Sequence, residues 1–116
     1  MKLEIVATKK FVPSVDRTGK RLSQDEINDI ESSSLVGSLD VKVWAQGIAL
    51  IAFRCNVING KNERFVALPA RKTPQGEWKQ TFELGDFLLE EVKRHGLRAM
   101  RQAEQLGTTL TVEIEL

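Results

Sequence analysis

Alternation of apolar and polar residues predicts that most of the chain is β-strand. The clearest run is 38–46, where Leu39, Val41, Val43 and Ala45 share one face and mainly polar side chains share the other. A period of two is the spacing of a half-buried strand. The same criterion predicts further strands over 1–11, 48–58, 63–68, 77–83 and 108–116.

Two turns are predicted between these strands. Gln46-Gly47 can supply a residue with positive φ between the strands over 38–46 and 48–58. The stronger signal is the Asn-Gly-Lys-Asn sequence at 59–62, because asparagine and glycine tolerate the left-handed geometry of type I′ hairpin turns. We therefore expect Gly60 to have a positive φ.

Proline and glycine also mark the loops. Pro69 should end the strand over 63–68, because proline offers no N–H to a neighbouring strand. The segment 70–76 contains Pro74 and Gly76, and 13–21 is interrupted by proline, aspartate and glycine. Both segments are predicted to be loops.

A long helix is predicted from Asp86 onward, where the apolar period changes from two to 3.6. Asp86 is the expected N-cap, and Gly107 stands where a left-handed C-cap residue belongs. The apolar face is expected to consist of Leu84, Leu88, Val92, His95, Ala99, Ala103 and Leu106.

A short helix is predicted after Ser23, because Ser23 and Glu26 have the spacing of a capping box. Ile27 and Ile30 would share one face of it, and three serines at 32–34 would end it. The alternative is a mobile excursion, since only these two large apolar residues could anchor the segment.

The pattern as a whole predicts an α+β fold in one domain over 1–116. A small antiparallel sheet of about five to six strands precedes a long C-terminal amphipathic helix and a closing strand. An inserted loop or short helix occupies 13–38. One helix covers only part of a sheet face, and the remaining apolar surface indicates a homodimer.

Composition agrees with a globular domain of the cytoplasm. The 116 residues are 41% hydrophobic and 28% charged, with 17 basic and 16 acidic side chains and a net charge of +1. No apolar stretch approaches the roughly 20 residues of a membrane span. Glu4 would interrupt the apolar core of a signal peptide, so we expect a cytosolic protein without a membrane partner.

Candidate catalytic chemistry is sparse. Cys55 and His95 are the only residues of their types, so neither an intramolecular disulfide nor a four-ligand Cys/His zinc site is expected. The two could act as nucleophile and base. Cys55, however, shares a strand phase with Ile51, Phe53 and Val57, which favours a buried thiol, and His95 is expected to be half-buried and hydrogen-bonded. We expect no enzyme, no cofactor, no metal and no small-molecule substrate, since common nucleotide-binding and hydrolase motifs are absent.

Basic residues are distributed less evenly than the net charge suggests. Arg71 and Lys72 lie in the predicted loop over 70–76, with Phe65 and Trp78 nearby in the sequence. Cations beside aromatics suit phosphates and stacked bases. In the long helix, four more cations fall within roughly 140° at 100° per residue. The candidate nucleic-acid contacts are Arg71, Lys72, Lys79, Lys93, Arg94, Arg98 and Arg101.

The alternative for the helix cations is an ordinary solvated surface, because cations are also favoured near a helix C-terminus. Trp44 has two interpretations as well. It lies on the polar face of its predicted strand, where it could stack a base or pack under a loop or partner.

The stretch 53–78 resembles the core of the SpoVG family, bacterial proteins named for stage V sporulation and septation. The sequences FVALP at 65–69, RKTP at 71–74 and GEW at 76–78 match the family motif in order, with Ala70 in place of a frequent serine. The longer segment over 13–38 and the strand over 108–116 depart from the family and indicate a divergent member.

This resemblance implies a small dimeric α+β protein that binds DNA or RNA and regulates gene expression. Arg71 and Lys72 correspond to the basic pair of the family; the helix cations are inferred from helix geometry alone. One alternative is a single-strand-binding, coactivator-like module, favoured if Trp44, Phe65 and Trp78 share an open sheet face. The other is a protein–protein interaction adaptor, favoured by exposed apolar patches without basic residues around them.

Overall fold

The computed structural model describes residues 1–80 and 83–116 and has the predicted α+β fold, with a long C-terminal helix and a closing strand. The elements follow one another as β1 (Lys2–Lys9), α1 (Gln24–Ser32), β2 (Leu35–Ala45), β3 (Ile48–Asn59), β4 (Arg64–Ala67), β5 (Ala70–Lys72), β6 (Trp78–Gln80), α2 (Asp86–Leu106) and β7 (Leu110–Glu115).

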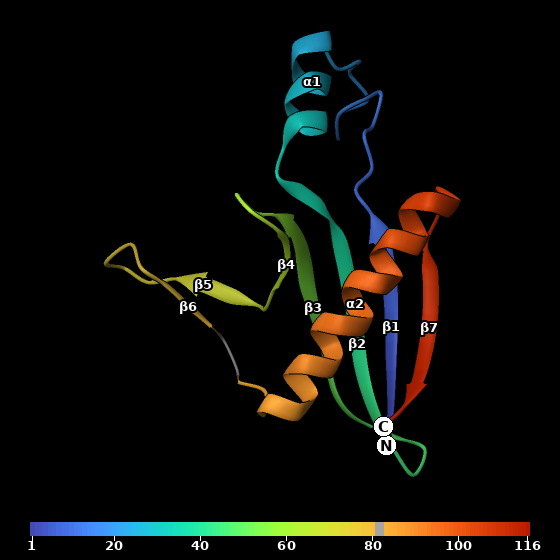
Figure 1. Cartoon of the computed structure of the whole chain (residues 1–116). Coiled ribbons are helices and arrows are strands. Elements are labelled where there is room, and N and C mark those ends of the chain that lie inside the picture. The colour runs from blue at the N-terminus through green and yellow to red at the C-terminus, as the bar shows by residue number, and fades with distance from the viewer. Residues whose placement is uncertain (81–82) are drawn as a thin grey trace.

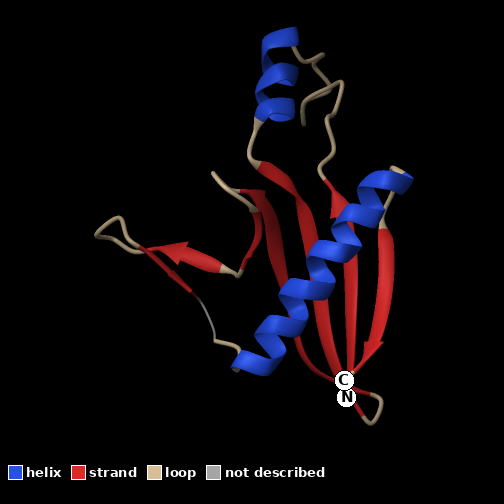
Figure 2. Cartoon of the chain, in the orientation of Figure 1, coloured by secondary structure: helices blue, strands red, loops and turns tan. Residues whose placement is uncertain are grey.

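Five strands form one antiparallel sheet in the order β4-β3-β2-β1-β7. The first strand of the chain lies inside the sheet, where Ile5 faces Val41 of β2 on one side and Val112 of β7 on the other. Helix α2 crosses one face of this sheet diagonally (Figure 1). Strands β5 and β6 form a separate two-stranded sheet that stands away from the main sheet on the β4 side (Figure 2).

The core lies between α2 and the inner face of the sheet. Leu3, Ile5, Leu39, Val57 and Met100 are among its fully buried side chains. Burying each such side chain contributes about 1.5–3 kcal/mol relative to leaving it in water. The predicted alternation of β7 is confirmed, because its even-numbered apolar residues are half-buried and pack on this core.

Close contact between α2 and β2 depends on Gly96. A Cβ at this buried position would lie 2.6 Å from Cδ1 of Leu39, so a larger residue would push the helix away from the sheet. Neither Gly96 nor Met100 was in the predicted apolar face, yet both are buried. Leu106, which was, is 64% exposed, because it is the last residue of α2 and precedes the turn into the edge strand β7.

The short helix α1 forms as the capping box predicts, so the helical alternative for this segment is the one observed. Ser23 Oγ accepts from the Glu26 N–H at 3.2 Å, and the Glu26 carboxylate accepts from the Ser23 N–H at 3.3 Å. The Lys10 ammonium fixes the other end, since it donates to the carbonyls of Ile30, Glu31 and Ser33. A cation at a helix C-terminus is electrostatically favourable.

The ends of α2 agree with the prediction only in part. Gly107 is the C-cap with φ 71°, and its N–H donates to the Ala103 carbonyl at 2.9 Å. Asp86 is not the N-cap: Gly85 occupies that position, without a capping side chain, and Asp86 is the first helical residue. In the first turn the carboxylate still faces the positive end of the helix dipole.

The turn predictions are confirmed at 46–47 and corrected at Gly60. Gln46 and Gly47 have φ 52° and 76° between β2 and β3. Gly60 does not have a positive φ, because four residues connect β3 to β4 and such loops are usually built on type I geometry. Its glycine is required for another reason: a Cβ would lie 2.6 Å from the Glu63 carbonyl oxygen and 3.0 Å from the Phe65 ring.

The predicted loop over 70–76 is wrong at its start. Pro69 ends β4 as expected, but the chain immediately forms β5, which pairs with β6. Arg71 and Lys72 therefore lie in a strand. The predicted strand over 77–83 is observed as Trp78–Gln80, and residues 81 and 82 of that prediction lie outside the described residues.

We predict that Gly60→Ala lowers the free energy of unfolding by about 1–3 kcal/mol, the usual cost of overpacking. The added methyl collides with backbone rather than with a flexible side chain. Urea denaturation measures the change. Gly85→Ala is the matched control, because nothing lies within 4 Å of a Cβ there. Equal stability of Gly60→Ala and wild type would contradict the assigned close contact.

Candidate nucleic-acid interface

Residues 70–80 form a two-stranded arm, called the ribbon below, that leaves the sheet at the end of β4. Its turn is closed by hydrogen bonds: the Thr73 N–H donates to the Glu77 carbonyl at 2.7 Å, and the Gly76 N–H donates to the Thr73 carbonyl at 2.9 Å. Gly76 has φ 86°, as a left-handed turn residue. Every ribbon residue except Thr73 is exposed, so the ribbon presents nearly all its side chains to solvent.

The ribbon places two cations directly opposite each other. Arg71 pairs with Lys79 across the strands, and Lys72 pairs with Trp78. Because neighbouring residues of a strand point to opposite faces, Arg71 and Lys79 share one face and Lys72 shares the other with Trp78. Like charges opposite each other destabilise a strand pair. Neither Arg71 nor Lys79 has an ion pair within the described residues, so an anion bound between them would relieve the repulsion.

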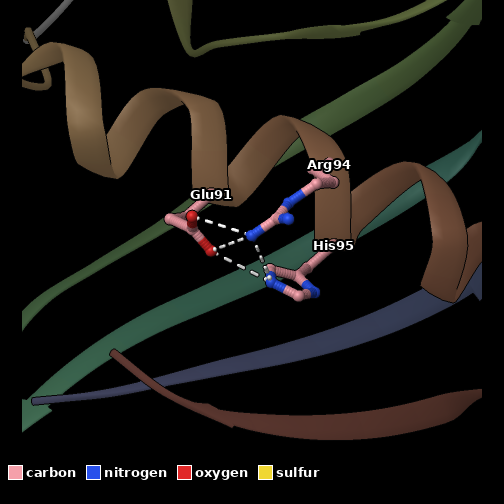
Figure 3. Close-up of polar contacts among 3 residues, drawn as sticks. All are labelled: Glu91, Arg94 and His95. Atoms are coloured by element: carbon pink, nitrogen blue, oxygen red, sulfur yellow. Dashed lines mark hydrogen bonds and ion pairs between the residues drawn. The ribbon is translucent and has the colours of Figure 1, made fainter.

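The four helix cations differ in their partners. Arg94 Nη2 donates to both oxygens of Glu91 at 2.8 Å, and His95 Nε2 lies 3.0 Å from Glu91 Oε2 (Figure 3). The hydrogen bond from Arg94, and then that from His95, lowers the pKa of Glu91 below its ordinary value. Arg94 thus has a carboxylate partner within its own helix. Lys93, Arg98 and Arg101 form no ion pair with any described residue.

Two of these free cations line a groove between α2 and β4. One hollow of about 600 Å³ includes Arg101, and a second of about 270 Å³ includes Lys93; both are also lined by Glu63, Arg64 and Leu97. The groove follows β4, the strand from which the ribbon leaves. The groove and the ribbon therefore both adjoin β4, which is an edge strand of the sheet. No described contact places Arg98 in this groove.

Arg64 also lines the groove, although it was not among the candidate contacts. Its guanidinium forms an ion pair with Glu104 of α2, and its Nε donates to Asn59 Oδ1 at 3.1 Å. Arg64 therefore holds α2 against β4 rather than offering a free charge. Its position 40 residues from Glu104 has no short-range signal in the sequence.

Cys55 and His95 lie as the structural interpretation of each predicts. Cys55 is 1% exposed on the inner face of β3, and burial raises the pKa of its thiol from 9.0 to about 12. His95 is half-buried and contacts Glu91. No hydrogen bond joins the two residues in the described chain, so they do not form a nucleophile–base pair there.

The three aromatics do not form one stacking surface, although Trp44 and Phe65 both lie on the sheet face away from the core. Trp44 pairs with Ala49 of β3, whereas Phe65 pairs with Ile58, nine residues further along the same strand. That separation is about 30 Å at 3.3 Å per residue. Trp78 lies outside this sheet, in the ribbon. The arrangement that would favour the coactivator-like alternative is therefore not observed.

The Trp44 side chain is half-buried and packs against neighbouring side chains instead of projecting into solvent. The Nζ atoms of Lys2 and Lys42 lie 5.8 and 6.0 Å from its ring centroid, a cation–π geometry. Its indole nitrogen is buried without a described hydrogen-bond partner. Of the two interpretations of Trp44, this environment favours packing over base stacking.

Residues 1–80 and 83–116 contain no cluster of three or more histidine, cysteine, aspartate or glutamate side chains suited to a metal ion. None of their helices is long and apolar enough to cross a membrane. No protein-family model matches the chain, and no curated protein or solved structure matches it. Membership of the SpoVG family therefore stays a prediction from the motif over 53–78.

We predict that Cys55 of the folded protein resists iodoacetamide at mildly alkaline pH, because the reactive thiolate is suppressed by burial. Mass spectrometry should detect rapid alkylation only after denaturation. The folded thiol keeps its proton up to about pH 12, whereas the unfolded thiol loses it near 9.0. The stability due to Cys55 should therefore be complete below pH 9 and fall as the pH rises toward 12, and Cys55→Ala should remove this component. Fast alkylation of the native protein would contradict the assignment.

Proposed function

We propose that this chain is a non-catalytic nucleic-acid-binding regulatory protein that acts as a homodimer in the cytoplasm. Phosphates would be contacted by the ribbon and by the unpaired cations of α2. The observation that carries the proposal is the cross-strand pair of Arg71 and Lys79, two like charges on an exposed ribbon without a described counter-ion.

A comparison with other arginines of the chain supports this assignment. Arg54, Arg64 and Arg94 each have a carboxylate partner, respectively Asp40, Glu104 and Glu91. Arg17, Arg21, Arg71, Arg98 and Arg101 have none among the described residues. Of these, Arg71 lies in the ribbon and Arg101 lines the groove beside β4. Unpaired cations such as Arg71 and Arg101 suit the phosphates of a nucleic acid, whose condensed counterions they replace.

The resemblance to the SpoVG family points the same way, since Arg71 and Lys72 match the basic pair of its motif. The pair does not act as one unit, however, because adjacent strand residues face opposite sides of the ribbon. Lys79, on the opposite strand, is the structural partner of Arg71. A phosphate bound by Arg71 would therefore also contact Lys79, which lies on the same face of the ribbon, rather than Lys72.

Exposed apolar side chains support the homodimer. Ile48, Leu50 and Phe87 are 64%, 60% and 63% exposed. Ile48 and Leu50 are two residues apart in β3 and so share one side of the strand, and adjoining exposed apolar side chains favour association. Among the described strands, the edge strand β7 also has a neighbour on one side only. Both features could bind a second copy of the chain. In the adaptor alternative, the same apolar side chains and strand edge would bind a different protein.

We predict that Arg71→Ala combined with Lys79→Ala weakens binding to nucleic acids of any sequence, because phosphate contacts do not read bases. The slope of log K against log salt should flatten by about 1.4 to 1.8 units, at roughly 0.7 per phosphate contact with single strands and 0.9 with duplex. Filter binding over a salt series measures the slope. Fold stability should change by less than about 0.5 kcal/mol.

The control removes the same charge elsewhere. Arg17→Ala combined with Lys20→Ala deletes two exposed cations without described ion pairs, in the loop before α1. This variant should keep the wild-type salt slope. Equal slopes for wild type and the Arg71/Lys79 variant would show that these two cations do not contact phosphates and are ordinary solvated side chains.

We predict that light scattering at micromolar concentration gives twice the 13.1 kDa of one chain. Replacing Ile48 and Leu50 by serine tests whether the exposed end of β3 forms the contact. If it does, the variant should be monomeric and folded, because neither side chain belongs to the buried core. A monomeric wild-type protein would contradict the homodimer.

A further inference from the structure

Trp78 is exposed to an extent unusual for tryptophan. It is 70% exposed at the first residue of β6, whereas large aromatics are normally well buried. Its cross-strand neighbour is Lys72, and no cation–π contact from a described residue covers its ring. A bare ring beside an unpaired cation is the combination that binds a base together with its phosphate.

The two ribbon faces carry different chemistry. One face has the cations Arg71 and Lys79, and the other has Lys72 and Trp78. A duplex is stiff, with a persistence length of about 150 base pairs, so it would lie against one face and leave the other unused. A single strand can bend around strands of three residues, which are about 10 Å long. The arrangement therefore favours a flexible strand over a duplex.

We infer that the ligand of the ribbon is single-stranded nucleic acid, with an unpaired nucleobase stacked on Trp78. Lys72 binds the phosphate beside this base, and Arg71 with Lys79 binds the backbone as it passes to the opposite face. This inference rests on the proposed function and adds a base-contacting residue to it. DNA and RNA offer the same base and phosphodiester chemistry, and the test includes both.

Trp44 provides an internal control. It is the only other tryptophan, half-buried and flanked by Lys2 and Lys42. Stacking of a base should quench the fluorescence of Trp78 and leave that of Trp44 nearly unchanged. Trp44→Phe leaves Trp78 as the sole indole, and Trp78→Phe leaves Trp44.

The first experiment titrates both variants with fifteen-nucleotide strands of thymidine or uridine, a matched duplex, and an abasic sugar-phosphate strand of equal length. We expect the two base-bearing single strands to quench Trp44→Phe and to leave Trp78→Phe unquenched. The abasic strand should bind through the cations without quenching. Quenching by the abasic strand alone, or equal quenching by the duplex, would overturn the inference.

The second experiment measures affinity for the thymidine strand. Trp78→Ala should weaken binding by about 5- to 140-fold, the effect of losing one stacked base. Trp78→Phe should retain most of the affinity, because a phenyl ring still stacks. Neither variant should change affinity for the abasic strand, and circular dichroism should show both to be folded.

The possible outcomes distinguish failure of base stacking on Trp78 from failure of nucleic-acid binding as a whole. If single strands bind, the salt slope depends on Arg71 and Lys79, and Trp78→Ala binds as well as wild type, the stacking inference fails and the proposed function stands. If wild type binds no nucleic acid, both fail. If Trp78 fluorescence instead changes with protein concentration alone, Trp78 belongs to a contact between copies, and the inference is overturned.

Discussion

The structure depends on the packing of one helix against one face of a five-stranded sheet. Helix α2 approaches β2 closely because Gly96 has no side chain to collide with Leu39. This contact buries the apolar residues of β1, β2 and β3 that could not remain in water. The Arg64–Glu104 ion pair then joins the same helix to β4. These contacts, together with its pairing with β3, fix β4, the strand from which the ribbon leaves.

The ribbon contributes little to that core and is held mainly by its own hydrogen bonds. Its two strands pair only with each other, and nearly all their side chains face solvent. An isolated two-stranded sheet is marginal in water, and the Arg71–Lys79 repulsion weakens it further. The exposed side chains of the ribbon are available to contact another molecule. An exposed element of this kind suits the proposed binding of phosphates and of an unpaired base.

Charge pairing distinguishes structural cations from candidate binding cations. Lys10 fixes α1, Arg64 fixes α2, and Arg94 organises Glu91 with His95. The sequence alone grouped Arg94 with the other helix cations, because helix geometry puts them on one side. Only the side-chain contacts show that Arg94 is satisfied within the protein, whereas Lys93 and Arg101 line an open groove.

Local patterns in the sequence determined the element types, the capping box of Ser23, the left-handed cap at Gly107 and the burial of Cys55, because each depends on residues a few positions apart. The φ of Gly60 and the start of β5 were predicted wrongly, since loop length and strand pairing decide them. Tertiary structure alone decided that Trp44 is packed between lysines while Trp78 stands in solvent, and that Lys79 rather than Lys72 faces Arg71. Such relations arise from register and packing between distant segments, which composition and periodicity do not contain.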